Sequence, residues 1–134
     1  MVRAEKISHV GIAVSNLEEA IKSFSNILEV SSVEREDVPT EGIRVAFLRV
    51  GDSEIELLSP TGETGSIAKF LKDRGPGLHH VAVKVPNVAE AIKDAKSKGF
   101  NVIDSVPRRA ARGAQAAFVH PKSLQGVLLE FYNT

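Results

Sequence analysis

Two segments of the chain, HVGIAV from His9 and HVAVKV from His80, alternate branched apolar residues with small, polar or charged ones. This period of two is typical of a β-strand that presents different residues to its two faces. Apolar residues at helical spacing follow each segment, so we predict a strand and then an amphipathic helix that covers the branched face. The predicted buried stripes are Leu17, Ala20, Ile21, Phe24 and Leu28 in the first helix and Val88, Ala91, Ile92 and Ala95 in the second.

Both predicted helices begin with the same capping signal. Asn16 and Asn87 offer side-chain oxygens to the first turn, and Glu19 and Glu90 follow three residues later. This spacing is that of a capping box. Gly99 predicts the end of the second helix, because glycine readily adopts the left-handed conformation that closes a helix.

The two segments are copies of one another, displaced by 71 residues. Such self-similarity predicts two modules of the same plan. Strand-like runs complete each copy, at 31–37, 43–50 and 54–60 in the first and at 101–107, 114–120 and 126–132 in the second, so each half reads β-α-β-β-β. The identical pairs are His9/His80, Val10/Val81, Val14/Val85, Asn16/Asn87, Glu19/Glu90, Ala20/Ala91 and Ile21/Ile92.

The spacing of later residues places one insertion in the second copy. Phe47 and Phe118 keep the 71-residue displacement, whereas Glu56 and Glu130 stand 74 residues apart. Three residues are therefore added in the HPKSLQG turn. We expect a single α+β domain over 1–134, with module one at about 5–60, module two at about 77–134, and a linker at about 61–76. The linker has a short helical core of Ile67, Phe70 and Leu71.

Four residues share the face that the helices do not cover. His9 and His80 alternate with the branched residues, and Glu56 and Glu130 alternate with apolar neighbours in their strands. Gly11, Ala13 and Ala82 on this face are small and are expected to leave room above the sheet. Two similar half-sheets arranged about a pseudo-twofold axis would bring the four residues into one cavity.

Two imidazoles and two carboxylates suit a divalent ion, with positions left for water or substrate. Each residue alone has a plainer explanation, since a strand histidine is often a hydrogen-bonded structural residue and a strand glutamate usually faces solvent. Equivalent placement in both copies favours the metal site. Glu54 shares the face of Glu56 and is its rival, while His79 has the core-facing parity and is not expected to be a ligand.

The amino-acid composition limits the kinds of molecule that the protein is expected to bind. The chain has 134 residues, 17 basic and 17 acidic side chains and no cysteine. The balance of charge argues against a nucleic-acid surface or binding to anionic membranes. We find no run of about 18 apolar residues and no leader-like N-terminus, so we expect a cytoplasmic protein.

The quoted segments, with VGDSEIELLSP, IAKFL before GLHHVAVKV, and HPKS before GVLLE, resemble the methylmalonyl-CoA epimerase family. This family belongs to the vicinal oxygen chelate superfamily, with glyoxalase I, extradiol dioxygenases and antibiotic-resistance proteins. The resemblance implies two tandem βαβββ modules in a curved mixed sheet around a metal cavity, and a homodimer. It matches His9, Glu56, His80 and Glu130 to the metal positions, with Co²⁺ expected first and Zn²⁺, Ni²⁺, Mn²⁺ or Mg²⁺ as alternatives.

The resemblance also implies a reaction, the epimerisation of methylmalonyl-CoA by removal and return of the C2 proton. Glu130 borders the HPKSLQG insertion and is expected to be both ligand and proton carrier. Lys122 and Ser123 are expected to hold the acyl-CoA. Further cations for its phosphates stand at Arg108, Arg109 and Arg112.

Two positions depart from the family pattern. Some members carry Gln at the position of Glu56, and some carry an acid at that of Val45, so the second proton carrier is open, with Glu41 as a nearby alternative. Two other functions also stay open. One is a glyoxalase-type isomerase with a glutathione adduct as substrate, and the other is a metal-independent ligand-binding protein of the same fold.

Overall fold

The computed structural model describes residues 2–30 and 32–134 and divides into two compact units. The first unit is Val10–His79, and the second is His80–Thr134 together with the N-terminal residues up to His9. Met1 and Ser31, the latter the first residue of the strand expected at 31–37, lie outside the described residues.

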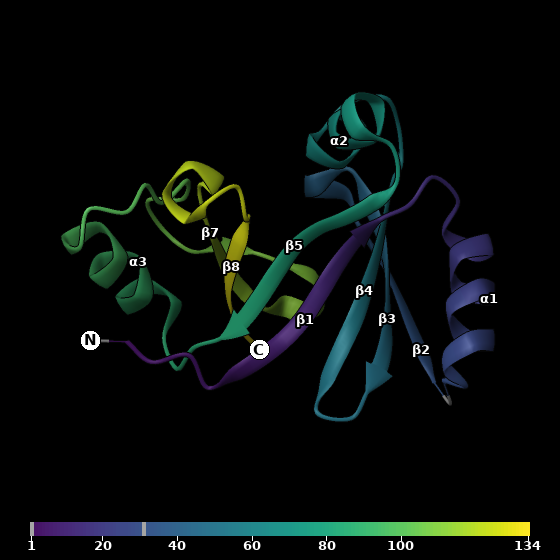
Figure 1. Ribbon diagram of the computed structural model, residues 1–134, viewed down its shortest axis with the longest axis horizontal. Coiled ribbons are helices and arrows are strands. Elements are labelled where there is room, and N and C mark those ends of the chain that lie inside the picture. The colour runs from purple at the N-terminus through teal and green to yellow at the C-terminus, as the bar shows by residue number, and fades with distance from the viewer. Residues whose placement is uncertain (1, 31) are drawn as a thin grey trace. The chain divides into compact units, whose positions relative to one another are not determined.

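The first unit holds one β-α-β-β-β module. Its hydrogen-bonded strand order is β2-β3-β4-β1, with antiparallel pairing of β2 with β3 and of β3 with β4. α1 lies alongside these strands (Figure 1), and Ile21 and Phe24 of α1 pack with Leu48 and Leu57 of the sheet. The elements are β1 (Lys6–Ala13, which begins in the second unit), α1 (Leu17–Leu28), β2 (Val33–Val38), β3 (Ile43–Val50) and β4 (Ser53–Pro60).

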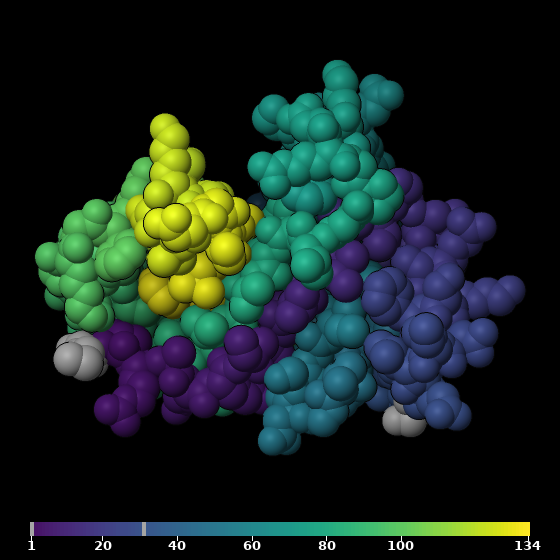
Figure 2. Space-filling model, in the orientation of Figure 1, coloured from purple at the N-terminus to yellow at the C-terminus, as the bar shows by residue number. Residues whose placement is uncertain are grey.

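The second unit repeats this plan. β5 pairs with β8 in parallel, β8 with β7 and β7 with β6 antiparallel, and α3 packs on Ala117, Val119 and Phe131 of this sheet. The N-terminal residues, purple in Figure 2, lie against α3 in green, where the Val2 N–H donates to Asp94 over 3.4 Å. The elements are β5 (Gly77–Lys84), α3 (Val88–Ser97), β6 (Arg108–Arg109), β7 (Gln115–Val119) and β8 (Leu129–Asn133).

Equivalent hydrogen bonds confirm the repeat. Val14 N–H donates to the Leu58 carbonyl over 2.9 Å, and 71 residues later Val85 N–H donates to the Tyr132 carbonyl over 3.1 Å. Glu56 stands opposite Phe47 across β3 and β4, as Glu130 stands opposite Phe118 across β7 and β8. The three added residues lie between β7 and β8, where the 3₁₀ helix η3 (Pro121–Leu124) replaces the tight turn at Gly51.

The predicted caps are also confirmed. Asn16 Oδ1 accepts from Glu19 N–H over 3.1 Å, and Asn87 Oδ1 accepts from Glu90 N–H over 2.9 Å. Each bond satisfies an amide that the helix itself leaves without a partner. Gly99 follows α3 with φ of 86°, the conformation for which glycine was expected there.

The linker contains the expected short helix. α2 (Ser66–Arg74) buries Ile67 on its inner side. In the described part of the chain, no helix combines the length and apolarity needed to cross a membrane.

The prediction of a strand at 101–107 is wrong. Only Val102 makes a β-bridge, to Val119, and the strand β6 comes later, at Arg108–Arg109. The Asp104 carboxylate accepts the Phe118 N–H over 2.8 Å, so a side chain replaces the backbone carbonyl that a regular ladder would supply. Pro107 has no N–H to donate and also disfavours a continuous strand. The run at 126–132 likewise becomes strand only from Leu129.

We predict that Asn16→Ala and Asn87→Ala each lower the free energy of unfolding by about 1 kcal/mol, because each removes a capping acceptor. The matched control is Asn26→Ala, the same change on the exposed side of α1, where alanine favours the helix and the effect stays within about 0.5 kcal/mol. Urea unfolding measures all three. An equal loss in the control would show that the caps contribute nothing particular.

Candidate metal and catalytic site

Three of the predicted site residues meet in the second unit. His9 on β1, His80 on β5 and Glu130 on β8 are 1%, 5% and 5% exposed. Glu130 Oε1 lies 3.0 Å from His9 Nε2 and 3.2 Å from His80 Nε2. One carboxylate oxygen is therefore shared between two buried imidazoles from distant parts of the sequence.

The alternation of residues along β8 explains why Glu130 faces the histidines. Leu129 and Phe131 pack on the core under α3, together with Val83 of β5. Glu130 and His80 occupy the opposite parity and the opposite face. The predicted orientation of these side chains is confirmed.

Aromatic rings surround the two imidazoles. The Tyr132 ring stands edge to face with His9 at a centroid distance of 4.8 Å, and the Phe118 ring does so with His80 at 5.7 Å. The two imidazoles are themselves perpendicular, at 5.3 Å. These contacts were not predicted from the sequence, although Tyr132 shares the parity of Glu130 and Phe118 stands opposite it.

The expectation that small residues leave open space is wrong at Ala82. This residue is fully buried and packs with Ala114, Ala116 and Tyr132. The small side chains on β5 and β7 make room for the Tyr132 ring rather than for solvent. The ring, in turn, supports His9.

Ser8 hydrogen-bonds to the second ring nitrogen of His9, since its Oγ lies 3.0 Å from His9 Nδ1. When His9 Nε2 donates to Glu130, Nδ1 accepts the Ser8 hydroxyl. If Nε2 offered its lone pair to a metal, Nδ1 would carry the proton and donate to Ser8. A hydroxyl serves both states because it both donates and accepts, and such contacts orient histidine ligands in metal proteins.

Electrostatics keep Glu130 ionised. Burial raises the pKa of this carboxyl, but hydrogen bonds from His80 and His9 and their charges outweigh burial and hold the pKa below its ordinary value. At neutral pH the group is therefore a carboxylate, which accepts hydrogen bonds, binds cations and takes up a proton.

The three donor groups fit a divalent ion. Ligand atoms held at about 2.1 Å from one ion in octahedral geometry lie about 3 Å from one another. The nitrogen–oxygen separations of 3.0 and 3.2 Å match this spacing. Imidazole nitrogen and carboxylate oxygen are also the ligands that Zn²⁺ and Co²⁺ accept.

Glu56 belongs to the first unit, on β4. It is buried, whereas its rival Glu54 is only half-buried, so burial favours Glu56. Val45 on β3 is fully buried and shares the parity of Phe47, the residue opposite Glu56. Glu41 is half-buried in the 3₁₀ helix η1 (Pro39–Glu41).

His79 and the basic loop residues have identifiable contacts. His79 is half-buried with its ring 5.0 Å from that of Phe70 on α2, which fits the core-facing parity predicted for it. Arg108 pairs with Asp104 over 2.8 Å and lies 5.1 Å over the Phe118 ring, the ring that contacts His80. Arg109 is exposed, and Arg112 is half-buried in the 3₁₀ helix η2 (Ala111–Gly113).

Lys122 and Ser123 lie in η3. Lys122 is exposed, and its backbone N–H donates to His120 Nδ1 over 3.0 Å. Ser123 Oγ accepts from the Asn101 N–H over 2.9 Å, so its hydroxyl connects this helix to the loop that follows α3 and retains a proton to donate.

The sequence model of the Glyoxalase/Bleomycin resistance protein/Dioxygenase superfamily matches residues 8–118 of the chain. Mitochondrial methylmalonyl-CoA epimerase of Homo sapiens is 36% identical over 93% of this chain and 72% of that protein.

Solved structures give the same picture. A hypothetical protein from Bacillus halodurans C-125 superimposes with a TM-score of 0.93 at 42% identity, covering 96% of this chain and 94% of that one. A methylmalonyl-CoA epimerase in complex with methylmalonyl-CoA and NH₄⁺ superimposes with a TM-score of 0.93 at 31% identity, covering 97% and 94%. At these identities the likeness extends beyond the fold.

We predict that Tyr132→Ala lowers the free energy of unfolding by about 3–5 kcal/mol, because the ring fills the space beside His9 and Ala82. Tyr132→Phe keeps the ring and removes the long contact from the hydroxyl to the Ala111 carbonyl, 3.5 Å, so it should cost less than about 1 kcal/mol. Denaturant unfolding distinguishes the two. Equal losses would assign the stabilisation to the hydroxyl and not to the ring.

Proposed function

Because the chain belongs to the methylmalonyl-CoA epimerase family of the glyoxalase/bleomycin resistance protein/dioxygenase superfamily, we propose that it epimerises methylmalonyl-CoA at C2. The observation that carries the proposal is the buried Glu130 carboxylate, 3.0 and 3.2 Å from two histidine nitrogens. This arrangement joins a group that can take a proton to groups that can hold a metal.

The chemistry requires no redox step. The C2 proton of methylmalonyl-CoA lies between a thioester and a carboxylate, is removed from one face and is returned to the other. A divalent ion, when bound, supplies Lewis-acid stabilisation of the negative charge that develops on the substrate, worth several kcal/mol. Side chains of the protein would carry the proton and hold the substrate.

The ligand set proposed here is His9, His80, Glu130 and Glu56. The first three are supported by their mutual distances in the second unit. Glu56 is supported by its burial and by its equivalence to Glu130, since each stands opposite the repeated phenylalanine. Co²⁺ is the first candidate, and Zn²⁺, Ni²⁺, Mn²⁺ or Mg²⁺ also accept these donors.

Glu130 is the proposed proton carrier on one face of C2. It is ionised at neutral pH and buried, and its position on a strand between two packed apolar residues holds the carboxylate in place. Val45 is apolar and fully buried, so it offers no group for the opposite face. Glu56, which is buried, is the stronger candidate there, and the half-buried Glu41 is the other.

The acyl-CoA is proposed to reach Lys122 and Ser123 in η3, between β7 and β8. Lys122 has an exposed side chain, and Ser123 retains a hydroxyl proton. Arg108 already pairs with Asp104, which makes it a weaker candidate for the phosphates than Lys122. The homodimer and the cytoplasmic location expected from the sequence stay proposals.

We predict that metal removal abolishes epimerisation and that Co²⁺ restores it. His80→Ala should weaken metal binding by more than about 100-fold, because it deletes a ligand. His79→Ala is the matched control, since its ring packs on Phe70, and its metal affinity should stay at the parent value. Calorimetric titration with Co²⁺ measures the affinities.

Full turnover by exhaustively stripped protein would contradict the metal requirement. Turnover of a glutathione hemithioacetal in place of methylmalonyl-CoA would transfer the same site to a glyoxalase-type isomerisation.

We predict that Glu130→Gln lowers exchange of the C2 proton by at least about 100-fold while much of the metal is retained. An amide binds weakly through oxygen but cannot accept the proton at neutral pH. The measurement is deuterium uptake at C2 of methylmalonyl-CoA in D₂O, together with metal content. Glu54→Gln, on the half-buried neighbour of Glu56, is the control and should exchange at the parent rate. Exchange near the parent rate in Glu130→Gln would exclude Glu130 as an essential base.

A further inference from the structure

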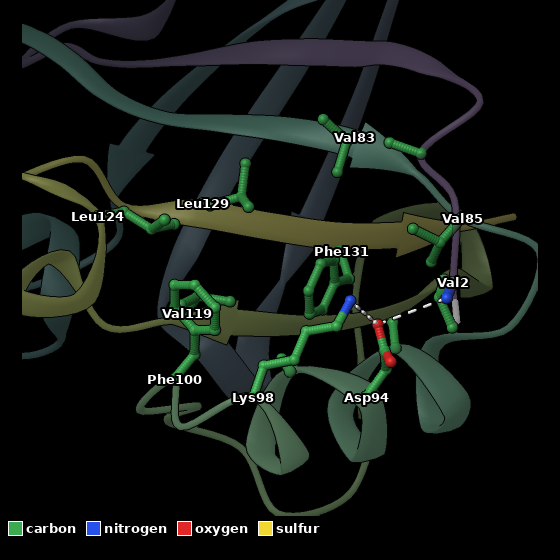
Figure 3. Close-up of a pocket in the computed structure, with 13 residues that line it drawn as sticks. Val2, Val83, Val85, Asp94, Lys98, Phe100, Val119, Leu124, Leu129 and Phe131 are labelled. Atoms are coloured by element: carbon green, nitrogen blue, oxygen red, sulfur yellow. Dashed lines mark hydrogen bonds and ion pairs between the residues drawn. The ribbon is translucent and has the colours of Figure 1, made fainter.

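An apolar cavity lies in the second unit, between α3 and the face of the sheet that points away from Glu130. Its volume is about 270 Å³. Val83 of β5, Leu129 and Phe131 of β8 and Val119 of β7 form one wall, and Ala91 and Ala95 of α3 form the other. Figure 3 shows the side chains of the sheet and of α3 that line it.

Comparison of the two modules explains why this cavity exists. Ala95 is the equivalent of Phe24, which packs against the core of the first unit. Val119 is likewise the equivalent of Leu48, so the second module has smaller side chains on both walls. Two further side chains are smaller in the second module, Val83 in place of Ile12 and Val88 in place of Leu17. One is larger, Phe131 in place of Leu57.

Residues outside the repeat close the cavity only in part. Val2 and Ala4 line one end, and Phe100 and Leu124 line another. The N-terminal residues are held by the Val2 N–H on Asp94, 3.4 Å, and by the Glu5 N–H on the Lys84 carbonyl, 2.8 Å. Phe100 is 37% exposed, so a large ring stands at the boundary between the cavity and solvent.

The lining is apolar apart from one ion pair. Among the described residues that form it, Asp94 and Lys98 are the charged ones, and they pair with each other over 2.8 Å. Figure 3 shows this pair on the α3 side of the cavity. An ion pair has no net charge to offer a ligand, and a carboxylate ligand would meet Asp94. The lining therefore selects uncharged, apolar molecules.

We propose that this cavity is a binding site for a small, uncharged apolar molecule of at least the size of benzene, separate from the metal site. A closed apolar cavity of about 150 Å³ lined by aliphatic and aromatic side chains binds benzene or xenon. The cavity here has a volume of about 270 Å³ and a similar lining, and it is partly open to solvent. Leu129 and Phe131, which line it, flank Glu130 in β8, so an occupant would contact the strand that carries the proposed base.

The direct test uses the unmodified protein. Crystals pressurised with xenon should show an anomalous peak between α3 and β8. Titration with benzene should give saturable methyl chemical-shift changes at Val83 and Leu129 and should raise the Tm by at least about 2 °C at saturation. Absence of xenon from this position and of saturable shifts would overturn the proposal.

Variants locate the binding site. Ala95→Phe installs the residue of the first module, Ala95→Leu is a smaller change should the phenylalanine prevent folding, and both should abolish the benzene response. Lys96→Leu adds an apolar side chain to an exposed position of the same helix and should leave the response intact. Benzene binding that survives Ala95→Leu would overturn the assignment to this cavity. Benzoate that binds as tightly as benzene would overturn the assignment to uncharged ligands.

Discussion

The buried carboxylate of Glu130 is the constraint on which the second unit depends. A carboxylate that is 5% exposed has lost nearly all of its hydration, and an unpaired charge in that position would be strongly destabilising. The imidazoles of His9 and His80 compensate for this loss at 3.0 and 3.2 Å. His9 lies 121 residues before Glu130 in the sequence, so the start and the end of the chain must meet for the charge to be stabilised.

The strand pairing repeated in the two modules places Glu130 where it meets the histidines. Strands β5 and β8 pair in parallel, and β7 pairs with β8 with Phe118 opposite Glu130, as Phe47 is opposite Glu56 in the first unit. The register that presents Glu56 therefore also presents Glu130. The second copy then differs in its surroundings, where alanines on β5 and β7 admit the Tyr132 ring and the ring packs on His9. A shared backbone thus carries two unequal environments.

The two faces of the sheet in the second unit are packed differently. The site face holds three polar side chains, His9, His80 and Glu130, and the ring of Tyr132 and the alanines fill the space around them. The other face packs on α3, where Ala95 replaces the Phe24 of the first module, and this leaves an apolar cavity. Because Glu130 alternates with Leu129 and Phe131 in one short strand, the packing of these two residues on one face helps to position the Glu130 carboxylate on the other.

The sequence by itself determined the repeat, both helix caps, most strands and the two histidines that meet Glu130. These features depend on alternation, helical spacing and capping, which act over a few residues and are copied in the two modules. Tertiary structure alone decided the partners of those residues: Ser8 and Tyr132 on His9, Phe118 on His80, and Arg108 on Phe118. It also decided that 101–107 is not a strand, because the Asp104 carboxylate takes the Phe118 amide fourteen residues away. Such contacts depend on the register and separation of distant strands, and local sequence patterns carry no information about either.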